Sequence, residues 1–198
     1  MKVRHQREKD LMPHYEAHPK YYSFAENSKV MTGVFKALGR NLNETKSILD
    51  VGCGSGGLAK VFATESSAKY VGVDYCNVRV NIAKISNIPN SEFHLNDVYE
   101  FLEEQIKLGN KYDTITIFEV LEHLEQPELI IQMAKSLLTG NGSIIASVPH
   151  NMPYIAHLQV YENESDVKKK LNPEQILFAD GKHYFCRWNK INTQVGPI

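Results

Sequence analysis

Four glycines lie within six residues where a short apolar run ends, in the stretch ILDVGCGSGGL at residues 48–58. Glycine lets a backbone approach its neighbours closely and adopt positive φ, so this pattern is typical of a ligand-binding turn between a strand and a helix. Gly52, Gly54 and Gly57 fit the spacing G-x-G-x-x-G of dinucleotide sites. Asp74 follows about 20 residues later, the spacing expected for a carboxylate that accepts hydrogen bonds from ribose hydroxyls. The sequence therefore predicts a nucleotide-type ligand.

A second pattern fits the same turn, because Asp50, Gly52, Gly54 and Gly56 form the series acidic-x-Gly-x-Gly-x-Gly. A pyrophosphate prefers the positive end of a helix without a carboxylate beside it. A cationic ligand is instead favoured by Asp50, directly or through water. Asp50 thus favours a cationic nucleoside, and a nicotinamide-dependent oxidoreductase that uses the same glycines is the alternative.

Titratable side chains follow two later strands. Glu119, Glu122 and His123 in EVLEH are spaced i, i+3 and i+4, and would share one face if this turn were helical. Two carboxylates and an imidazole suit Mg²⁺, Mn²⁺, Fe²⁺ or Zn²⁺, with His183 or His150 as a further ligand. A divalent metal is the alternative that we do not favour. The favoured interpretation is a metal-free pocket in which His123 contacts the substrate or acts as a general base.

The elements that must hold these residues alternate between strand and helix. Apolar, β-branched runs predict strands at 47–51, 69–74, 92–97, 112–118 and 143–148. Helical spacing predicts helices at 57–65, 78–86 and 98–108, and from Pro127 to Leu138 before GNG at 140–142. This order predicts an α/β fold: a doubly wound, mostly parallel sheet with helices on both faces. Ligands bind such sheets beyond the carboxyl ends of the strands, where the motif residues lie.

The two ends of the chain differ from this alternating core. Helical spacing from Tyr21 to Leu38, before Gly39, predicts an N-terminal helix. After Pro149 the pattern predicts only a helix near 165–171. We therefore expect a single domain with an N-terminal helical segment (1–44), a ligand-binding core (45–150) and a C-terminal segment on the substrate side (151–198). Either the last segment is an insertion that faces the substrate, or the chain stops before a complete sheet.

The stretch LDVGCGSGG resembles the first motif of the class I S-adenosylmethionine-dependent methyltransferases. The resemblance continues in the same order through YVGVDYCN, LNDVYEF, YDTITIFEVLEHL and LLTGNGSIIASVP, over about residues 45–150. It implies the Rossmann-like fold of that class, S-adenosyl-L-methionine as the cofactor and S-adenosyl-L-homocysteine as the product.

The resemblance also implies roles for particular residues. Asp74 matches the acid that binds the ribose, Tyr75 lies beside the adenine, and Asp97 meets the adenine amino group, although Asp97 is also a candidate helix cap. The expected cofactor-binding residues are Asp50, Gly52, Cys53, Gly54, Gly56, Asp74, Tyr75, Asp97, Val98 and Phe118. The expected catalytic residues are Glu119, His123 and His150, the last because it directly follows the strand at 143–148.

Methyl transfer is an in-line displacement, so most of its acceleration can come from alignment, with a base added where the acceptor is a hydroxyl. The favoured function is methyl transfer to a hydroxyl of a small molecule. Small-RNA 3′-terminal 2′-O-methyltransferases and ubiquinone-pathway O-methyltransferases carry a similar E-x-x-E-H. A metal-assisted RNA 2′-O-methyltransferase is therefore an alternative, and a cofactor-binding protein without catalysis is another.

The composition limits the partners. Lys and Arg number 22 against 23 Asp and Glu, a net charge of −1, which argues against DNA binding and, with no basic-aromatic stripe, against RNA. No apolar run reaches the roughly 20 residues of a membrane span, and the N-terminus is charged, so we expect a cytoplasmic protein. The three cysteines at wide spacing predict free thiols. The sequence indicates no oligomeric state.

Overall fold

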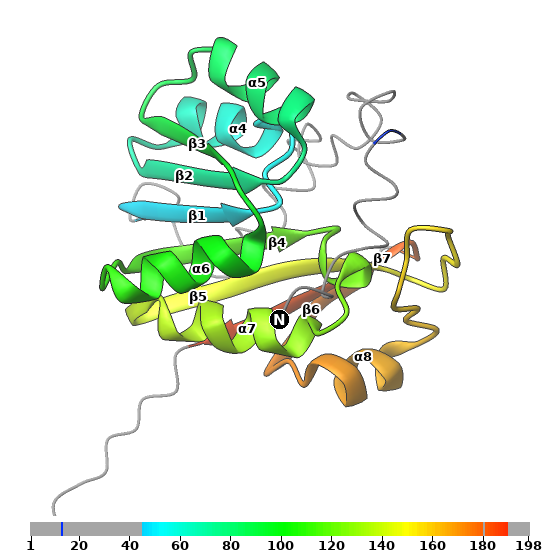
Figure 1. Cartoon of the computed structure of the whole chain (residues 1–198). Helices are drawn as coiled ribbons and strands as arrows, with labels where there is room; N and C mark the ends of the chain where they lie inside the picture. Colours follow the sequence, from blue (N-terminus) through cyan, green and yellow to red (C-terminus); the bar gives the residue numbers. More distant parts are fainter. Residues whose placement is uncertain (1–12, 14–44, 180, 190–198) are drawn as a thin grey trace, which may run out of the picture.

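The computed structural model describes residues 13, 45–179 and 181–189, with the side chains of 178 and 179 excepted. These residues form a seven-stranded sheet in the order β3-β2-β1-β4-β5-β7-β6 (Figure 1). The helix predicted from Tyr21 to Leu38 lies outside the described residues.

Five strands of the sheet are parallel, as the alternating pattern predicts. They are β1 (Ser47–Val51), β2 (Lys69–Asp74), β3 (Ser91–Leu95), β4 (Tyr112–Phe118) and β5 (Leu138–Pro149). The chain proceeds from β1 outward through β2 to β3, then returns to β4 on the other side of β1. β1 and β4 both point to the right in Figure 1. The edge beyond their carboxyl ends is therefore the switch point at which open α/β sheets bind ligands.

Helices cover both faces, which confirms the doubly wound fold. The bounds are α4 (Gly57–Glu65), α5 (Asn77–Ile85), α6 (Val98–Lys107), α7 (Pro127–Ser136) and α8 (Glu164–Leu171). Residues of α6, α7 and α8 pack in one apolar cluster, and those of α4 and α5 pack in another. Figure 1 shows α6 and α7 passing in front of the strands. Among the described helices, none has the length and apolar character that crossing a membrane requires.

The two clusters exist because successive side chains of a strand point to opposite faces. Ile48 and Leu49 are neighbours in β1 and both are fully buried, yet Ile48 belongs to the α4 cluster and Leu49 to the α6 cluster. A strand that is buried on both sides must be apolar at nearly every position. This is why the central strands could be identified from their composition.

The C-terminal segment adds two strands to the sheet that the sequence did not predict. β6 (Gln175–Ala179) and β7 (His183–Asn189) are antiparallel, and β7 pairs with β5. β7 mixes polar and aromatic residues, but Phe185 and Trp188 are fully buried. Trp188 Nε1 also donates to the carbonyl oxygens of Leu171 and Asn172 at 3.2 and 3.1 Å, which joins β7 to α8. The segment that follows β5 therefore continues the sheet beyond the five parallel strands.

The boundary between α7 and β5 differs from the prediction. α7 ends at Ser136, two residues early, and β5 begins at Leu138, so that GNG lies within the strand. A register shift between Tyr112 and Thr114 of β4 accommodates these residues. A Cβ at Gly142 would lie 3.0 Å from Leu138 and from the carbonyl oxygen of Tyr112. The glycine is thus required by close packing in the sheet and does not mark the end of the helix.

Candidate active site

The glycine turn after β1 is filled by protein at one position and open at another. Gly52 has φ of 80° and Gly54 has φ of 54°, both in the left-handed region that favours glycine. A Cβ at Gly52 would lie 2.2 Å from Cγ2 of Val120, in the turn after β4. At Gly54, no atom of the described residues lies within 4 Å of the corresponding position. Gly52 is therefore needed for packing, whereas no described residue covers the backbone at the Cβ position of Gly54.

Asp50 lies in β1, behind this turn, and is 4% exposed. Thr116 Oγ1 donates to its Oδ1 at 2.7 Å, and the Tyr70 hydroxyl donates to its Oδ2. Burial raises the pKa of Asp50 to about 6, although both hydrogen bonds act in the opposite direction. Both carboxyl oxygens thus have partners on neighbouring strands, and the predicted effect of Asp50 on a cationic ligand stays a prediction.

Asp74 joins two turns at the switch point. Its Oδ2 accepts from the backbone N–H of Gly54 at 2.9 Å, and its Oδ1 accepts from that of Cys76 at 2.8 Å. Burial raises the pKa of Asp74 despite these bonds. Tyr75 is partly buried against the cluster of Cys76 and Ala156. The structure thus brings Asp74 and Gly54 together, and the predicted contact of Asp74 with a ribose stays a prediction.

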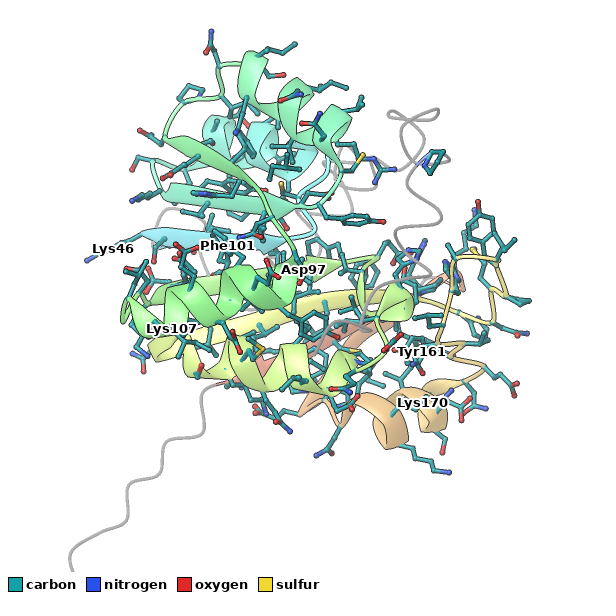
Figure 2. All side chains as sticks on the ribbon, in the orientation of Figure 1. Lys46, Asp97, Phe101, Lys107, Tyr161 and Lys170 are labelled. Atoms are coloured by element: carbon teal, nitrogen blue, oxygen red, sulfur yellow. The ribbon has the colours of Figure 1, made fainter. Side chains whose placement is uncertain are left out.

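Asp97 is the N-cap of α6, which confirms the capping role. Its Oδ1 accepts from the backbone N–H groups of Tyr99 and Glu100 at 2.9 and 3.3 Å. Figure 2 shows Asp97 at the start of this helix, and the buried Val98 follows it. The contacts of Asp97 and Val98 with a cofactor stay predictions.

Two further residues of the expected cofactor set lie within the fold. Cys53 is buried beside Gly72, where a Cβ would lie 2.8 Å from its Sγ, and burial raises the pKa of the thiol well above its usual range. These features agree with a small turn residue and not with a nucleophile. Phe118, the last residue of β4, packs against the α4 cluster.

The E-x-x-E-H stretch is not a regular helix, so its three titratable side chains do not share a helical face. Glu119 has φ of 55°, and only Leu121–His123 forms a single 3₁₀ turn, η3. Glu119 Oε1 accepts from Ser147 Oγ at 2.8 Å, and its Oε2 lies 3.8 Å from His183 Nε2. Glu119 and His183 therefore form a pair across the ends of β4 and β7.

Glu122 is 1% exposed, and its Oε2 has no hydrogen-bond partner among the described residues. Its Oε1 lies 3.6 Å from His123 Nε2, beyond hydrogen-bond distance. Burial, and secondarily the charge of Glu119, raise the pKa of Glu122 well above its usual range. The neutral form of this carboxyl is therefore favoured.

His123 is held in one tautomer by the segment that follows β5. Its Nδ1 lies 3.0 Å from the carbonyl oxygen of Ala156, and since a carbonyl only accepts, Nδ1 carries the proton. Burial lowers the pKa of His123 to about 4, so the ring is neutral at neutral pH and Nε2 keeps a lone pair. Nε2 is therefore the ring atom of His123 that could accept a proton or bind a cation.

His157 joins this site, although the sequence did not identify it. Its ring meets that of His123 edge to face at 4.9 Å, and the ligand atoms of Glu122, His123 and His157 all lie within 4.8 Å of one another. His157 lies in a loop without periodicity or a motif, so no local pattern could have identified it. Among the described residues, the cluster that could hold a metal thus consists of Glu122, His123 and His157. Glu119 and His183, which the sequence analysis also considered as ligands, form a separate pair.

His150 contacts backbone on both sides of its ring. Nε2 lies 2.9 Å from the carbonyl oxygen of Glu162, and Nδ1 lies 3.4 Å from that of Gly181. Its backbone N–H donates to the carbonyl oxygen of Lys182 at 2.8 Å. These contacts join the end of β5 to the turn between β6 and β7, and a catalytic role for His150 stays a prediction.

Comparison with known proteins gives the family. A family model described as "Methyltransferase domain" matches residues 23–185. The ubiquinone biosynthesis O-methyltransferase of Escherichia fergusonii is 31% identical over 144 residues, which are 67% of this chain and 59% of that protein. Its counterpart in Acinetobacter baylyi is 31% identical over 112 residues, 54% of this chain and 45% of that protein. The chain thus spans at most 59% of the length of these two relatives.

Solved structures share the fold. Magnesium protoporphyrin IX methyltransferase from Synechocystis, with S-adenosylhomocysteine bound, superposes with a TM-score of 0.61 at 20% identity, over 85% of this chain and 84% of that one. An N-methyltransferase from Bradyrhizobium japonicum, also with S-adenosylhomocysteine, gives a TM-score of 0.66 at 14% identity, over 92% and 97%. The fold inferred from the motifs is therefore confirmed. With the match over residues 23–185, the resemblance is confirmed too: the chain belongs to the methyltransferase domain family.

Proposed function

We propose that the chain binds S-adenosylmethionine beyond the carboxyl ends of β1, β2 and β3 and transfers its methyl group to a hydroxyl of a small molecule. The observation that carries this proposal is Asp74, which two backbone N–H groups hold at the switch point beside the bare backbone of Gly54. The family match and the O-methyltransferase relatives support it.

The residues around the turn suit such a cofactor, which supplies a methyl group on a positively charged sulfur. The Asp74 carboxylate has about four lone-pair sites, and the backbone N–H groups of Gly54, Tyr75 and Cys76 lie against it, which leaves room to accept from a ribose hydroxyl. Asp97 and Val98 begin α6 at the next strand end, beside the expected place of the adenine, and Tyr75 lies in the turn between β2 and α5. The bare backbone at Gly54 lets a ligand approach without a side chain in the way.

His123 is our choice for the group that receives the proton of the acceptor hydroxyl. Its neutral ring offers a lone pair at Nε2, which is the form a general base needs. Glu119 directly follows β4, four residues before His123, and is held by Ser147 beside His183. It would orient the acceptor. Methyl transfer then needs the acceptor oxygen in line with the methyl group and its sulfur.

A divalent cation is a second candidate, favoured by one observation, the grouping of Glu122, His123 and His157. One carboxylate and two imidazoles suit Zn²⁺, Fe²⁺ or Mn²⁺. The lone pair of His123 Nε2 cannot serve a cation and the acceptor proton together. The two candidates are therefore exclusive at this atom, and a chelator distinguishes them.

Calorimetry with S-adenosylhomocysteine tests the cofactor site. We expect saturable binding by the full chain, and a loss of about tenfold to hundredfold in affinity for Asp74→Asn, because a ribose hydroxyl loses a charged acceptor. Glu92→Gln on β3 is the control, since that carboxylate is exposed, and its affinity should equal that of the wild type. Absence of binding by the wild type at millimolar ligand would exclude the proposal.

An acceptor screen with a radiolabelled methyl donor tests the second half of the reaction. Phenolic, quinol-like and sugar hydroxyls and an RNA 3′ end are offered with and without EDTA. Transfer to a small hydroxyl that survives EDTA supports the base at His123. Transfer that EDTA abolishes and added Mn²⁺ or Zn²⁺ restores supports the cation, and labelling of RNA alone contradicts the small-molecule acceptor.

A further inference from the structure

The segment after β5 crosses the edge of the sheet and contacts both halves of the site. We call residues 152–159 the crossing segment. Residues 151–155 are exposed, but Ala156 is only 2% exposed. Its side chain packs against Cys76 in the turn that follows Asp74, with Tyr75 of the same turn and Val78 of α5 beside them. The carbonyl oxygen of the same residue accepts from His123.

The crossing segment is hydrogen-bonded to the turn that follows β4. The backbone N–H groups of Leu158 and Gln159 both donate to the carbonyl oxygen of Glu122, at 2.7 and 3.0 Å. Gln159 Nε2 also donates to Leu124 at 3.3 Å. The segment therefore follows the 3₁₀ turn η3 that carries His123, and a change in one must alter the other.

His157 stabilises the crossing segment by hydrogen bonds within it. Its Nδ1 lies 2.7 Å from the carbonyl oxygen of Met152 and its backbone N–H donates to Tyr154 at 2.9 Å. As for His123, the carbonyl accepts, so Nδ1 of His157 carries the proton. These bonds fold the segment into a compact loop that presents the Ala156 carbonyl to His123 on one side and the His157 ring on the other.

We propose that Ala156 and His157 are positioning residues, which hold His123 in the Nδ1-protonated tautomer and tie its orientation to the turn at Cys76. The inference rests on the proposed function for its consequence, since the tautomer leaves Nε2 as the reactive atom. It holds for either candidate there, because a proton acceptor and a cation ligand both need Nε2 unprotonated. The crossing segment thus links the turn that would hold the cofactor to the residue that would act on the acceptor.

Histidine NMR on the full chain without ligand tests the positioning directly. Long-range ¹H–¹⁵N spectra report which ring nitrogen carries the proton, and His123→Asn assigns the signals. The wild type should show one Nδ1-protonated tautomer at His123. His157→Ala and Cys76→Ala should each give a mixture of tautomers. The first removes the hydrogen bond to the carbonyl oxygen of Met152, and the second removes the sulfur of the side chain that Ala156 packs against.

Conservative variants provide the controls. In His157→Asn the side-chain amide can still donate to Met152 and should restore the single tautomer. Cys76→Ser keeps the side chain's size and should behave as the wild type, and so should His94→Ala on β3, whose ring lies beside Glu92 and Phe101. A single tautomer retained in both His157→Ala and Cys76→Ala would overturn the proposal.

The kinetic signature separates positioning from a general loss of structure. His157→Ala should lower kcat about tenfold, a part of what a general base contributes, and should leave the KM for the methyl donor within about twofold. His157→Asn should recover most of kcat. With EDTA present, so that loss of a cation ligand plays no part, a fall in kcat that His157→Asn does not recover would contradict positioning. If the wild type binds no S-adenosylhomocysteine, the proposed function fails, but the ligand-free tautomer measurement still decides this inference.

Discussion

The two halves of the site are built in different ways. On the cofactor side, carboxylates are held by backbone N–H groups that are mostly close in the chain, as Asp97 is by Tyr99 and Asp74 is by Cys76. On the acceptor side, side chains meet partners that are far away in the chain, as Glu119 meets Ser147 and His123 meets Ala156. The first half is therefore specified by short motifs, and the second half exists only after the chain has folded.

The difference extends to how completely the carboxyl groups are satisfied. Both oxygens of Asp74 accept hydrogen bonds, whereas Oε2 of the buried Glu122 has no partner among the described residues. A buried polar atom without a partner costs free energy, so such an atom at a site is expected to serve a ligand or a reaction. In the proposed site, the carboxyl group expected to meet the cofactor is thus fully paired in the fold, whereas the buried carboxyl on the proposed acceptor side is not.

The largest effect is expected at the contact that joins the two halves, Gly52 against Val120. Gly52→Ala should lower the free energy of unfolding by about 2–6 kcal/mol, because positive φ strains an alanine and its Cβ overlaps the valine. Urea denaturation of the full chain measures the loss. Adding Val120→Ala should recover about 1 kcal/mol or more relative to the sum of the single changes. If the losses of stability in the two single variants simply added in the double variant, the alanine at position 52 would not be in steric conflict with Val120.

Asp50 tests the comparison from the other direction, because it belongs to the glycine motif but is held by Tyr70 and Thr116 on other strands. Its pKa is raised from 3.8 to about 6 in the folded state, so between these values the folded protein holds a proton that the unfolded chain has released. Stability contributed by this group is therefore lost as pH rises through that window. The loss should approach about 3 kcal/mol, relative to a variant without the carboxyl.

The matched variant is Asp50→Asn, which keeps the size and one acceptor but does not titrate. We expect the free energy of unfolding of the wild type to fall relative to that of Asp50→Asn between about pH 4 and pH 7. Urea denaturation at a series of pH values gives the difference. A difference that is constant with pH would show that burial does not raise the pKa of Asp50.

The smallest effect is expected at Asp97, where the partners are local. Asp97→Ala should cost about 1 kcal/mol of stability, because α6 loses its N-cap, whereas Asp97→Asn should cost almost nothing, since asparagine caps equally well. Thermal or urea denaturation distinguishes the pair. Equal losses for both would mean that the charge of Asp97 stabilises the helix and that capping is secondary.

The strands and helices of the core could be predicted because each has a local cause. β1, β2 and β4 are apolar runs that must be buried on both faces, and the starts of α6 and α7 carry a capping Asp97 and Pro127 at the first turn. β6 and β7 escaped prediction because they pair antiparallel at the edge of the sheet and mix polar with aromatic residues. The end of α7 was wrong by two residues because pairing with Tyr112 extends β5 backward to Leu138.

By itself, the sequence determined the fold class, the glycine turn and the acids that follow β2 and β3, since backbone conformation and capping depend on residues a few positions apart. Only the tertiary structure decided that Gly52 makes room for Val120, that Asp50 is enclosed by two hydroxyls, and that His157 stands beside His123. These contacts join residues from different strands and loops. Their geometry depends on the register of the sheet and the path of the crossing segment, which no short pattern in the chain contains.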